Sequence, residues 1–282
     1  TGKQIWEVEA GNLFPQDRGS GPRGTPTVDG DTVYSLSADG TLLSLAAATG
    51  KKNWAKNILD EFKGSQIHWG LSESPLVDGP RLIVTPGGKD KTVVALDKKT
   101  GKPLWGSAGE DAAGYSSAIS FDFGGQRHTV VFTSKGAMGL NAANGWVMWK
   151  YNKVSNRTAN IATPIYRDGH VFLSSDYGTG CALLKLSAEG DRVNATEVYF
   201  SREMRNHYCT SVLEGKHLYG FSSGILTAME FMTGEVAWRD RSVGKGQLLL
   251  AEGLLYLQGE TGTVALAEAT PTAYKEISRF DF

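Results

Sequence analysis

The chain has 282 residues, with 29 Lys and Arg against 30 Asp and Glu, so its formal net charge is −1. This near-neutral balance argues against a nucleic-acid partner. At 40% hydrophobic and 21% charged residues, the chain falls in the globular class and outside the disordered and collagen-like classes. No apolar stretch approaches the run of about 20 residues that a transmembrane helix needs, so no transmembrane segment is expected.

Glycine and cysteine content narrow the fold further. Glycine occupies 35 of the 282 positions, a larger share than the usual one of roughly 7%. This excess indicates many tight turns. Two cysteines, Cys181 and Cys209, are too few for a disulfide framework or a four-cysteine zinc site, and we expect both to be small buried side chains. The chain begins at Thr1 without a methionine or a leader pattern, which we interpret as a removed leader or an excised segment.

A Thr-Gly-x-x-x-Trp motif recurs along the chain. Its copies occupy 1–6, 49–54, 100–105, 144–149 (with Asn for Thr) and 233–238. The interval before the last copy is about twice the others, which predicts a degenerate copy near Glu189-Gly190. A second marker, a proline-containing strand followed by Asp-Gly, occurs at 25–30, 74–79 and 163–169, with weaker forms beginning at 117, 210 and 247. Both markers indicate six full repeats of about 44 residues.

The pattern inside one repeat is β-structure. Thr32–Leu36 alternates apolar and polar residues, 42–45 forms a second strand after an Asp-Gly turn, and a third strand surrounds Trp54. With the proline-marked strand, each repeat has four strands, which is typical of a β-propeller blade. We therefore predict an all-β fold in which 1–282 form a single β-propeller domain. The expected blades are 21–60, 68–110, 114–154, 160–202, 207–243 and 245–282, and 1–10 are expected to be the outer strand of a preceding blade.

Five of the seven tryptophans end the repeated turns. A large aromatic at one fixed place in each blade fills the gap between twisted neighbouring sheets, so we interpret these as structural docking residues. They are Trp6, Trp54, Trp105, Trp149 and Trp238.

These residues carry a resemblance to a known family. Residues 95–105 match the tryptophan-docking motif Ala-x-Asp-x-x-Thr-Gly-Lys-x-x-Trp in full, and the other copies match it in part. The chain thus resembles the PQQ-like (pyrroloquinoline-quinone-like) β-propellers. Through 69–77, 162–165, 233–238 and 244–246 it resembles, more narrowly, the bacterial propellers labelled alcohol or polyvinyl-alcohol dehydrogenase-like. The resemblance implies an eight-bladed ring closed by its chain ends, about one blade missing at each end, and a periplasmic or secreted protein.

The blade pattern also predicts a binding site. The loop before each innermost strand opens beside the propeller axis, so residues just before the proline-marked strands are expected to converge at the channel mouth. Their donors, cations and aromatic surfaces suit an anionic or hydroxyl-rich ligand. The candidates are Arg23, His68, Trp69, Tyr115, Asn160, Asn206, His207 and Lys245, with Tyr177 added from the loop 175–178.

Three functions follow from this site. One is a PQQ-dependent quinoprotein alcohol dehydrogenase with calcium, although the adjacent-cysteine and calcium-ligand signatures of such enzymes are not found in the sequence. Another is a non-catalytic propeller or scaffold that binds a carbohydrate or other small polar ligand, or a partner protein. The analogy with binding proteins of similar fold supports this function. The last is a polysaccharide lyase or hydrolase using His207 and Tyr115 with Lys245 or Arg23. We favour the non-catalytic binder, without a cofactor.

Overall fold

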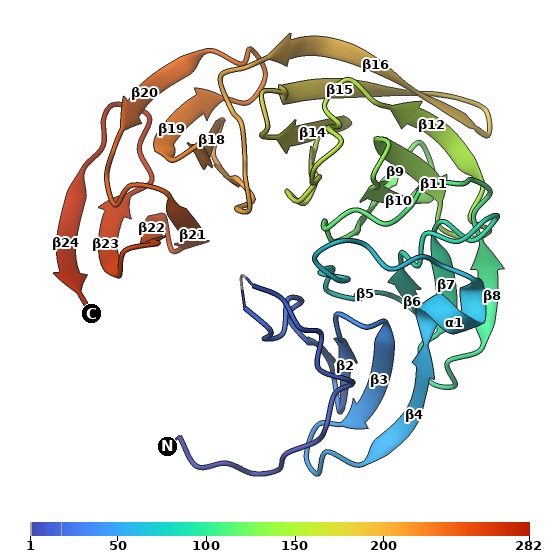
Figure 1. Cartoon of the computed structure of the whole chain (residues 1–282). Helices are drawn as coiled ribbons and strands as arrows, with labels where there is room; N and C mark the ends of the chain where they lie inside the picture. The colour runs from blue at the N-terminus through green and yellow to red at the C-terminus, as the bar shows by residue number, and fades with distance from the viewer. Residues whose placement is uncertain (1, 18) are drawn as a thin grey trace. The chain divides into compact units, whose positions relative to one another are not determined.

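The computed structural model describes residues 2–17 and 19–282 as two compact units. Unit 1 is Thr1–Lys150 and unit 2 is Tyr151–Phe282. The described residues form six four-stranded sheets, and in each sheet the strands follow one another in chain order as an antiparallel meander (Figure 1). The sheets agree in number with the six predicted repeats. The assignment of the whole chain to one propeller domain stays a prediction.

Unit 1 contains three of the sheets. The first is β1 (Thr27–Asp29), β2 (Thr32–Leu36), β3 (Thr41–Ala46) and β4 (Lys52–Asn57). The second is β5 (Leu76–Asp78), β6 (Arg81–Val84), β7 (Val94–Asp97) and β8 (Pro103–Gly106). The third is β9 (Ile119–Phe123), β10 (Gln126–Phe132), β11 (Ala137–Asn141) and β12 (Val147–Tyr151), which ends one residue past the unit boundary.

Unit 2 contains the other three. The fourth sheet is β13 (Ile165–Arg167), β14 (His170–Ser175), β15 (Gly180–Glu189) and β16 (Arg192–Ser201). The fifth is β17 (Val212–Glu214), β18 (His217–Ser222), β19 (Ile225–Glu230) and β20 (Val236–Asp240). The sixth is β21 (Gly246–Ala251), β22 (Leu254–Gly259), β23 (Thr263–Glu268) and β24 (Glu276–Asp281).

The one helix in the described part of the chain is α1 (Ile58–Phe62). It begins at Asn57, whose side chain accepts hydrogen bonds from the backbone N–H groups of Leu59 and Asp60, and it ends at Lys63 in the left-handed region. No helix among residues 2–17 and 19–282 is long and apolar enough to cross a membrane.

Residues 2–10 carry no strand assignment. A β-strand is recognised by its hydrogen bonds to a neighbouring strand, and an outer strand of a preceding blade would pair within that blade. The outer strand expected at 1–10 therefore stays a prediction. Trp6 in this segment nevertheless contacts the first sheet, because its indole N–H donates to the carbonyl of Ala47 at 2.7 Å.

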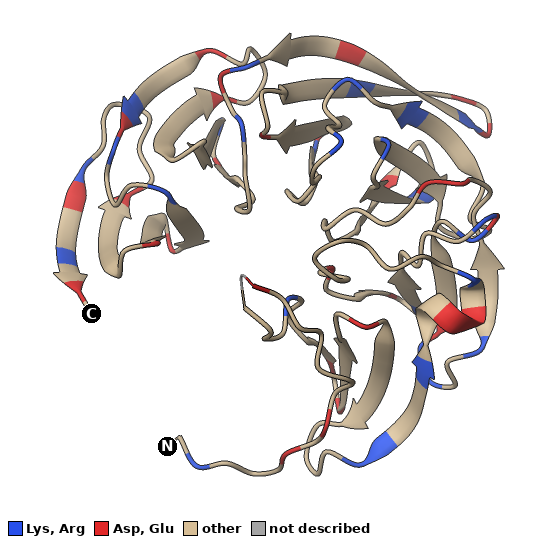
Figure 2. Cartoon of the chain, viewed as in Figure 1, with Lys and Arg blue, Asp and Glu red and all other residues tan. Residues whose placement is uncertain are grey.

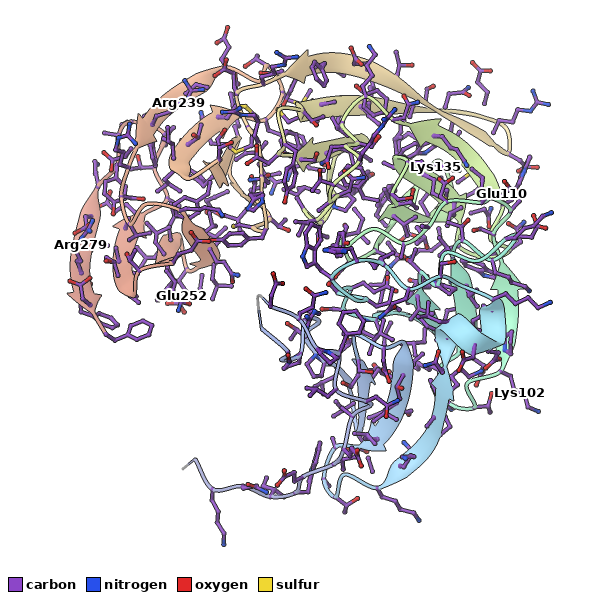
Figure 3. The ribbon with its side chains drawn as sticks, in the orientation of Figure 1. Lys102, Glu110, Lys135, Arg239, Glu252 and Arg279 are labelled. Atoms are coloured by element: carbon purple, nitrogen blue, oxygen red, sulfur yellow. The ribbon has the colours of Figure 1, made fainter. Side chains whose placement is uncertain are left out.

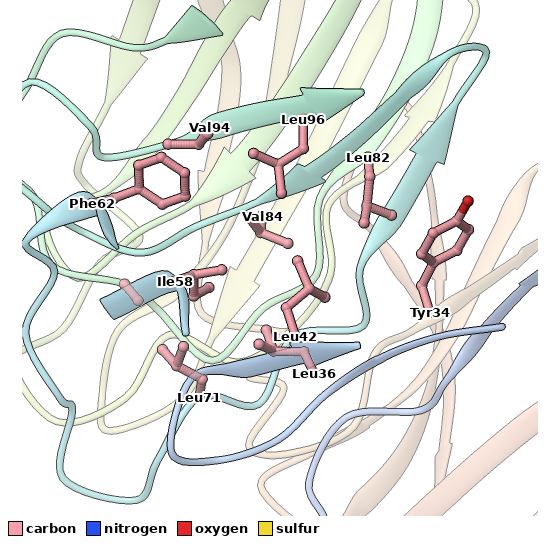
Figure 4. Close-up of a cluster of buried hydrophobic side chains, with 11 residues drawn as sticks. Tyr34, Leu36, Leu42, Ile58, Phe62, Leu71, Leu82, Val84, Val94 and Leu96 are labelled. Carbon is pink, nitrogen blue, oxygen red and sulfur yellow. The ribbon is translucent and has the colours of Figure 1, made fainter. Parts of the chain in front are cut away.

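Apolar side chains pack between adjacent sheets within each unit. Tyr34 and Leu42 of the first sheet meet Leu82 and Leu96 of the second in one buried cluster (Figure 4). In unit 2 a comparable cluster joins Tyr219 and other residues of the fifth sheet to the sixth. Alternation of inward apolar residues along short strands produces these clusters, as the sequence pattern predicts.

Aromatic side chains also link successive sheets through hydrogen bonds. An indole N–H donates to a backbone carbonyl from Trp54 to Lys98 (3.1 Å), from Trp105 to Ala142 (3.0 Å) and from Trp238 to Thr270 (2.8 Å). In the fourth sheet Tyr199 takes this place, and its hydroxyl donates to Phe231 O at 3.0 Å. Trp149 does not make the corresponding bond, because its indole nitrogen is buried without a partner in the described residues. Its ring covers Gly139 instead.

Charged side chains of both signs are interspersed along the two units, as a near-neutral net charge leads us to expect (Figure 2). The expectation for the cysteines is confirmed, since Cys181 and Cys209 are both buried and free. Burial raises the pKa of Cys181 to about 12 and that of Cys209 to about 11.

These raised pKa values predict inert thiols. We expect neither cysteine of the native protein to react with the thiol reagent DTNB at pH 8, and both to react in concentrated urea, because the reactive species is the accessible thiolate. The absorbance of the released thionitrobenzoate measures this. Rapid reaction of either thiol in the absence of urea would contradict the buried placement.

Candidate functional site

Two groups of the predicted binding residues come together, one in each unit. In unit 1 we define the Trp69 cluster as Arg23, His68, Trp69 and Tyr115. The Trp69 ring lies nearly perpendicular to the His68 ring at a centroid distance of 4.6 Å, and it is tilted against the Tyr115 ring at 5.6 Å. The Tyr115 hydroxyl also accepts a hydrogen bond from the Trp69 backbone N–H at 3.4 Å. Because His68 is exposed and the other two are half-buried, the cluster presents aromatic surface to solvent.

Arg23 fixes this cluster from the side. Its Nε donates to the carbonyl of Trp69 at 2.6 Å, and its terminal nitrogens donate to the carbonyls of Gly19, at 3.0 Å, and Gly21. The guanidinium carbon lies 5.4 Å from the centre of the Phe14 ring. Arg23 therefore binds loop carbonyls, and we assign it mainly to positioning Trp69 rather than to holding an anion.

The second group lies in unit 2. We define the Tyr177 cluster as Tyr177, His207, Tyr208 and Lys245. The Tyr177 hydroxyl lies 2.9 Å from Nε2 of His207, whose ring in turn contacts Tyr208 at a centroid distance of 5.3 Å. The ammonium group of Lys245 lies 4.7 Å from the centre of the Tyr208 ring and 3.2 Å from a carboxylate oxygen of Glu260. This arrangement combines aromatic surface, a cation and an anion on one patch.

Backbone conformation holds Tyr177 at the surface. Its φ is 57°, a left-handed conformation that is unusual for a bulky residue, and 45% of its surface is exposed. The neighbouring Asp176 carboxylate accepts the hydroxyl of Ser223 at 2.9 and 3.0 Å, and Ser223 itself has a φ of 51°. Such strained positions persist only where surrounding contacts impose them, and they are frequent at binding sites.

Two predicted site residues are buried and bind their own unit. The Asn160 side-chain oxygen, in a residue 2% exposed, accepts from the backbone N–H of Asn156 at 3.0 Å. The Asn206 side chain, in a residue 1% exposed, accepts from Ser211 at 2.9 Å and donates to Phe221 O at 3.3 Å. Both amides thus stabilise loops behind the surface, because buried polar groups need partners.

Sequence reasoning missed several participants. Tyr208, Asp176 and Ser223 were not among the candidates, although Tyr208 directly follows His207 and Asp176 directly precedes Tyr177. Adjacency to a predicted loop residue could have found Tyr208 and Asp176, whereas no signal in the sequence pointed to Ser223. The predicted convergence of all six loops at one channel mouth stays a prediction.

A buried acid was also missed. Glu73 is 3% exposed; its Oε1 accepts the backbone N–H of Thr85 at 2.6 Å, while its Oε2 has no hydrogen-bond partner in the described residues. Burial raises the pKa of Glu73 to about 7. No group of three or more His, Cys, Asp or Glu residues that could hold a metal ion occurs in residues 2–17 and 19–282.

Comparison with known proteins defines the class. The chain has the fold of BamB from Moraxella catarrhalis, with a TM-score of 0.67 and 18% identity over 92% of this chain and 74% of that one. A designed protein, Ika8, gives a TM-score of 0.60 at 12% identity over 88% of this chain and 70% of that one. These similarities confirm the predicted β-propeller fold, built from PQQ-like repeats.

The family follows from the sequence. The model of the family described as outer membrane protein assembly factor BamB matches residues 1–240, and the chain belongs to this family. Two proteins with that name are similar to it. The one from Shewanella oneidensis is 23% identical over 83% of this chain, and the one from Moranella endobia is 24% identical over 86%. The chain spans 60% and 64% of their lengths.

Proposed function

We propose that this chain is a non-catalytic, protein-binding β-propeller that takes part in assembling outer-membrane proteins. The observation that carries the proposal is the match of the family model over residues 1–240. Both similar proteins are named as outer-membrane protein assembly factors rather than for quinone chemistry or polysaccharide cleavage. Such a role lies outside the cytoplasm, in agreement with the periplasmic or secreted localisation expected from the resemblance.

The two aromatic clusters are the docking points that we propose. Tyrosine, tryptophan and arginine dominate the binding energy of protein interfaces, because large, rigid side chains bury much area at little entropic cost. The Trp69 and Tyr177 clusters contain such residues, already held by hydrogen bonds from loop to loop. A partner would therefore meet pre-ordered anchors, which lowers the entropic cost of binding.

We also propose that Trp6, Trp54, Trp105 and Trp238 are docking residues that hold neighbouring sheets together. The hydrogen bonds from their indole nitrogens to carbonyls of the next sheet support this role.

A genetic experiment tests the function. Deleting the gene in its own bacterium should lower the amount of folded β-barrel outer-membrane proteins several-fold, and the wild-type gene should restore it. Folded barrels are measured by their faster migration in gels when samples are not boiled. Unchanged barrel levels in the deletion strain would reject the proposed function.

Variants of the two clusters test the site in the same strain. Trp69→Ala and Tyr177→Ala should fail to restore barrel levels, because removing a buried interface anchor weakens binding by roughly 2 kcal/mol or more. Matched controls are Trp146→Ala, at a tryptophan 58% exposed in unit 1, and Tyr256→Ala, at a tyrosine 44% exposed in unit 2. Full restoration by the cluster variants would reject the site while leaving the function intact.

A further inference from the structure

A cavity of about 360 Å³ lies between the first and second sheets of unit 1. Its volume is within the range of small-molecule sites in proteins. The lining side chains that can form ion pairs or hydrogen bonds with a ligand are Asp29, Thr32, Tyr34, Ser44, Asn53, Lys98 and Lys99. None of them belongs to the Trp69 or Tyr177 cluster.

The inner wall of the cavity is pre-ordered. Tyr34 is 2% exposed, and its hydroxyl donates to the carbonyl of Lys98 at 3.0 Å. Its ring belongs to the apolar cluster, whereas its hydroxyl points away from those side chains (Figure 4). Beside it, Ser44 is 1% exposed and accepts a hydrogen bond from the Asn53 amide at 3.3 Å. Hydroxyl and amide groups held in this way can donate hydrogen bonds to the hydroxyls of a ligand and accept hydrogen bonds from them.

The rim of the cavity carries an exposed ammonium group. Lys98 forms an ion pair with Asp29 at 2.5 Å, while Lys99 next to it is exposed. The side chain of Lys99 can therefore bind an anionic group of a ligand at the rim.

The second sheet has an arginine at the place where the first sheet has the cavity. Asp78 is the last residue of β5 as Asp29 is of β1, but Asp78 is 4% exposed and is bound by both Arg81, at 3.1 Å, and Arg127, at 2.8 Å. Thr32 pairs with Asp29 in the same register as Arg81 with Asp78. A threonine where the second sheet has an arginine leaves side-chain volume unfilled beside Asp29.

We propose that this cavity binds a sugar acid of monosaccharide size. Its carboxylate would lie at Lys99 on the rim, and its hydroxyls would exchange hydrogen bonds with Tyr34, Ser44 and Asn53. A sugar acid carries both one negative charge and several hydroxyls, which distinguishes it from simple anions and from neutral sugars. This site is separate from the protein-docking clusters and does not depend on them.

Isothermal titration calorimetry of the whole chain with D-glucuronate, D-glucose, acetate and inorganic phosphate tests the proposal. We expect saturable binding of glucuronate at least tenfold tighter than that of the other three, because a charge-assisted hydrogen bond and the hydroxyl contacts act together. No saturation by glucuronate up to about 10 mM would overturn the proposal. Equal binding of phosphate or acetate would overturn the assignment to sugar acids.

Variants locate the ligand. Thr32→Arg restores the residue of the second sheet, fills the cavity and should abolish glucuronate binding in a folded protein. Lys99→Gln should weaken glucuronate binding about tenfold and leave glucose unaffected. Lys102→Gln is the matched control, because Lys102 lies in the same turn region and is exposed. Its side chain points outward at the periphery of unit 1 (Figure 3). Unchanged binding in Thr32→Arg, with its circular dichroism spectrum intact, would overturn the location.

Discussion

Replacing Trp105 by alanine will lower the free energy of unfolding by about 3 kcal/mol, the lower end of the range for removing a packed tryptophan. The Trp105 ring packs against the cluster formed by the second and third sheets, and its indole N–H donates to Ala142 O at 3.0 Å. The substitution removes apolar contact and leaves the carbonyl of a fully buried residue without this donor. Urea unfolding followed by far-ultraviolet circular dichroism measures the loss.

Two further variants separate the contributions. Trp105→Phe keeps much of the ring contact and loses the hydrogen bond, so we expect a loss of about 1 kcal/mol. Trp146→Ala removes a tryptophan of the same unit that is 58% exposed, and the change should stay within about 0.5 kcal/mol. Equal losses from Trp105→Ala and Trp146→Ala would show that Trp105 has no special structural role.

The second large effect concerns Glu73 and pH. Its pKa is about 7 in the folded chain, against 4.5 for the ordinary group, because the carboxyl is buried with one oxygen unpartnered. The folded state therefore holds this proton more tightly than the unfolded state. The resulting stability is fully present below pH 4.5 and is lost as pH rises to about 7, by about 3 kcal/mol in total.

Glu73→Gln removes this dependence. The glutamine keeps an oxygen for the Thr85 N–H and does not ionise, so the variant should be more stable than the wild type at pH 8 and similar to it at pH 4.5. The difference between the two proteins isolates Glu73, since burial lowers the pKa of His128 and this histidine contributes to both curves alike. Urea unfolding at several pH values measures it. A constant difference across this range would show that Glu73 is ionised in the folded chain.

Much of the fold could be predicted because it rests on local rules. The predicted strand Thr32–Leu36 is β2, and the predicted strand 42–45 lies within β3. The Thr-Gly turns place Gly50 and Gly101 at a φ of 69°, a conformation in which glycine pays no steric penalty. Alternating side chains and turn residues act within a few positions of one another, so they can be recognised in the sequence.

The site could be predicted only in part, because loop order does not specify which side chains meet. Position in the loop selected Trp69 and Tyr177, which lie beside the candidate residues Tyr115 and His207. The same rule also selected Asn160 and Asn206, which the structure buries with partners from their own unit. It gave no indication that Arg23 donates to the carbonyls of Trp69 and Gly19.

The sequence by itself therefore determined the repeat, the four-stranded sheets and the family, since these depend on periodicity, turn chemistry and motif residues. Tertiary structure alone decided which loop side chains are exposed, that Glu73 is buried, and that Thr32 leaves a cavity beside Asp29. The physical reason is that burial, pairing and empty volume depend on side chains far apart in the sequence, such as Lys98 and Asp29, which are 69 residues apart and are brought together only by packing between sheets.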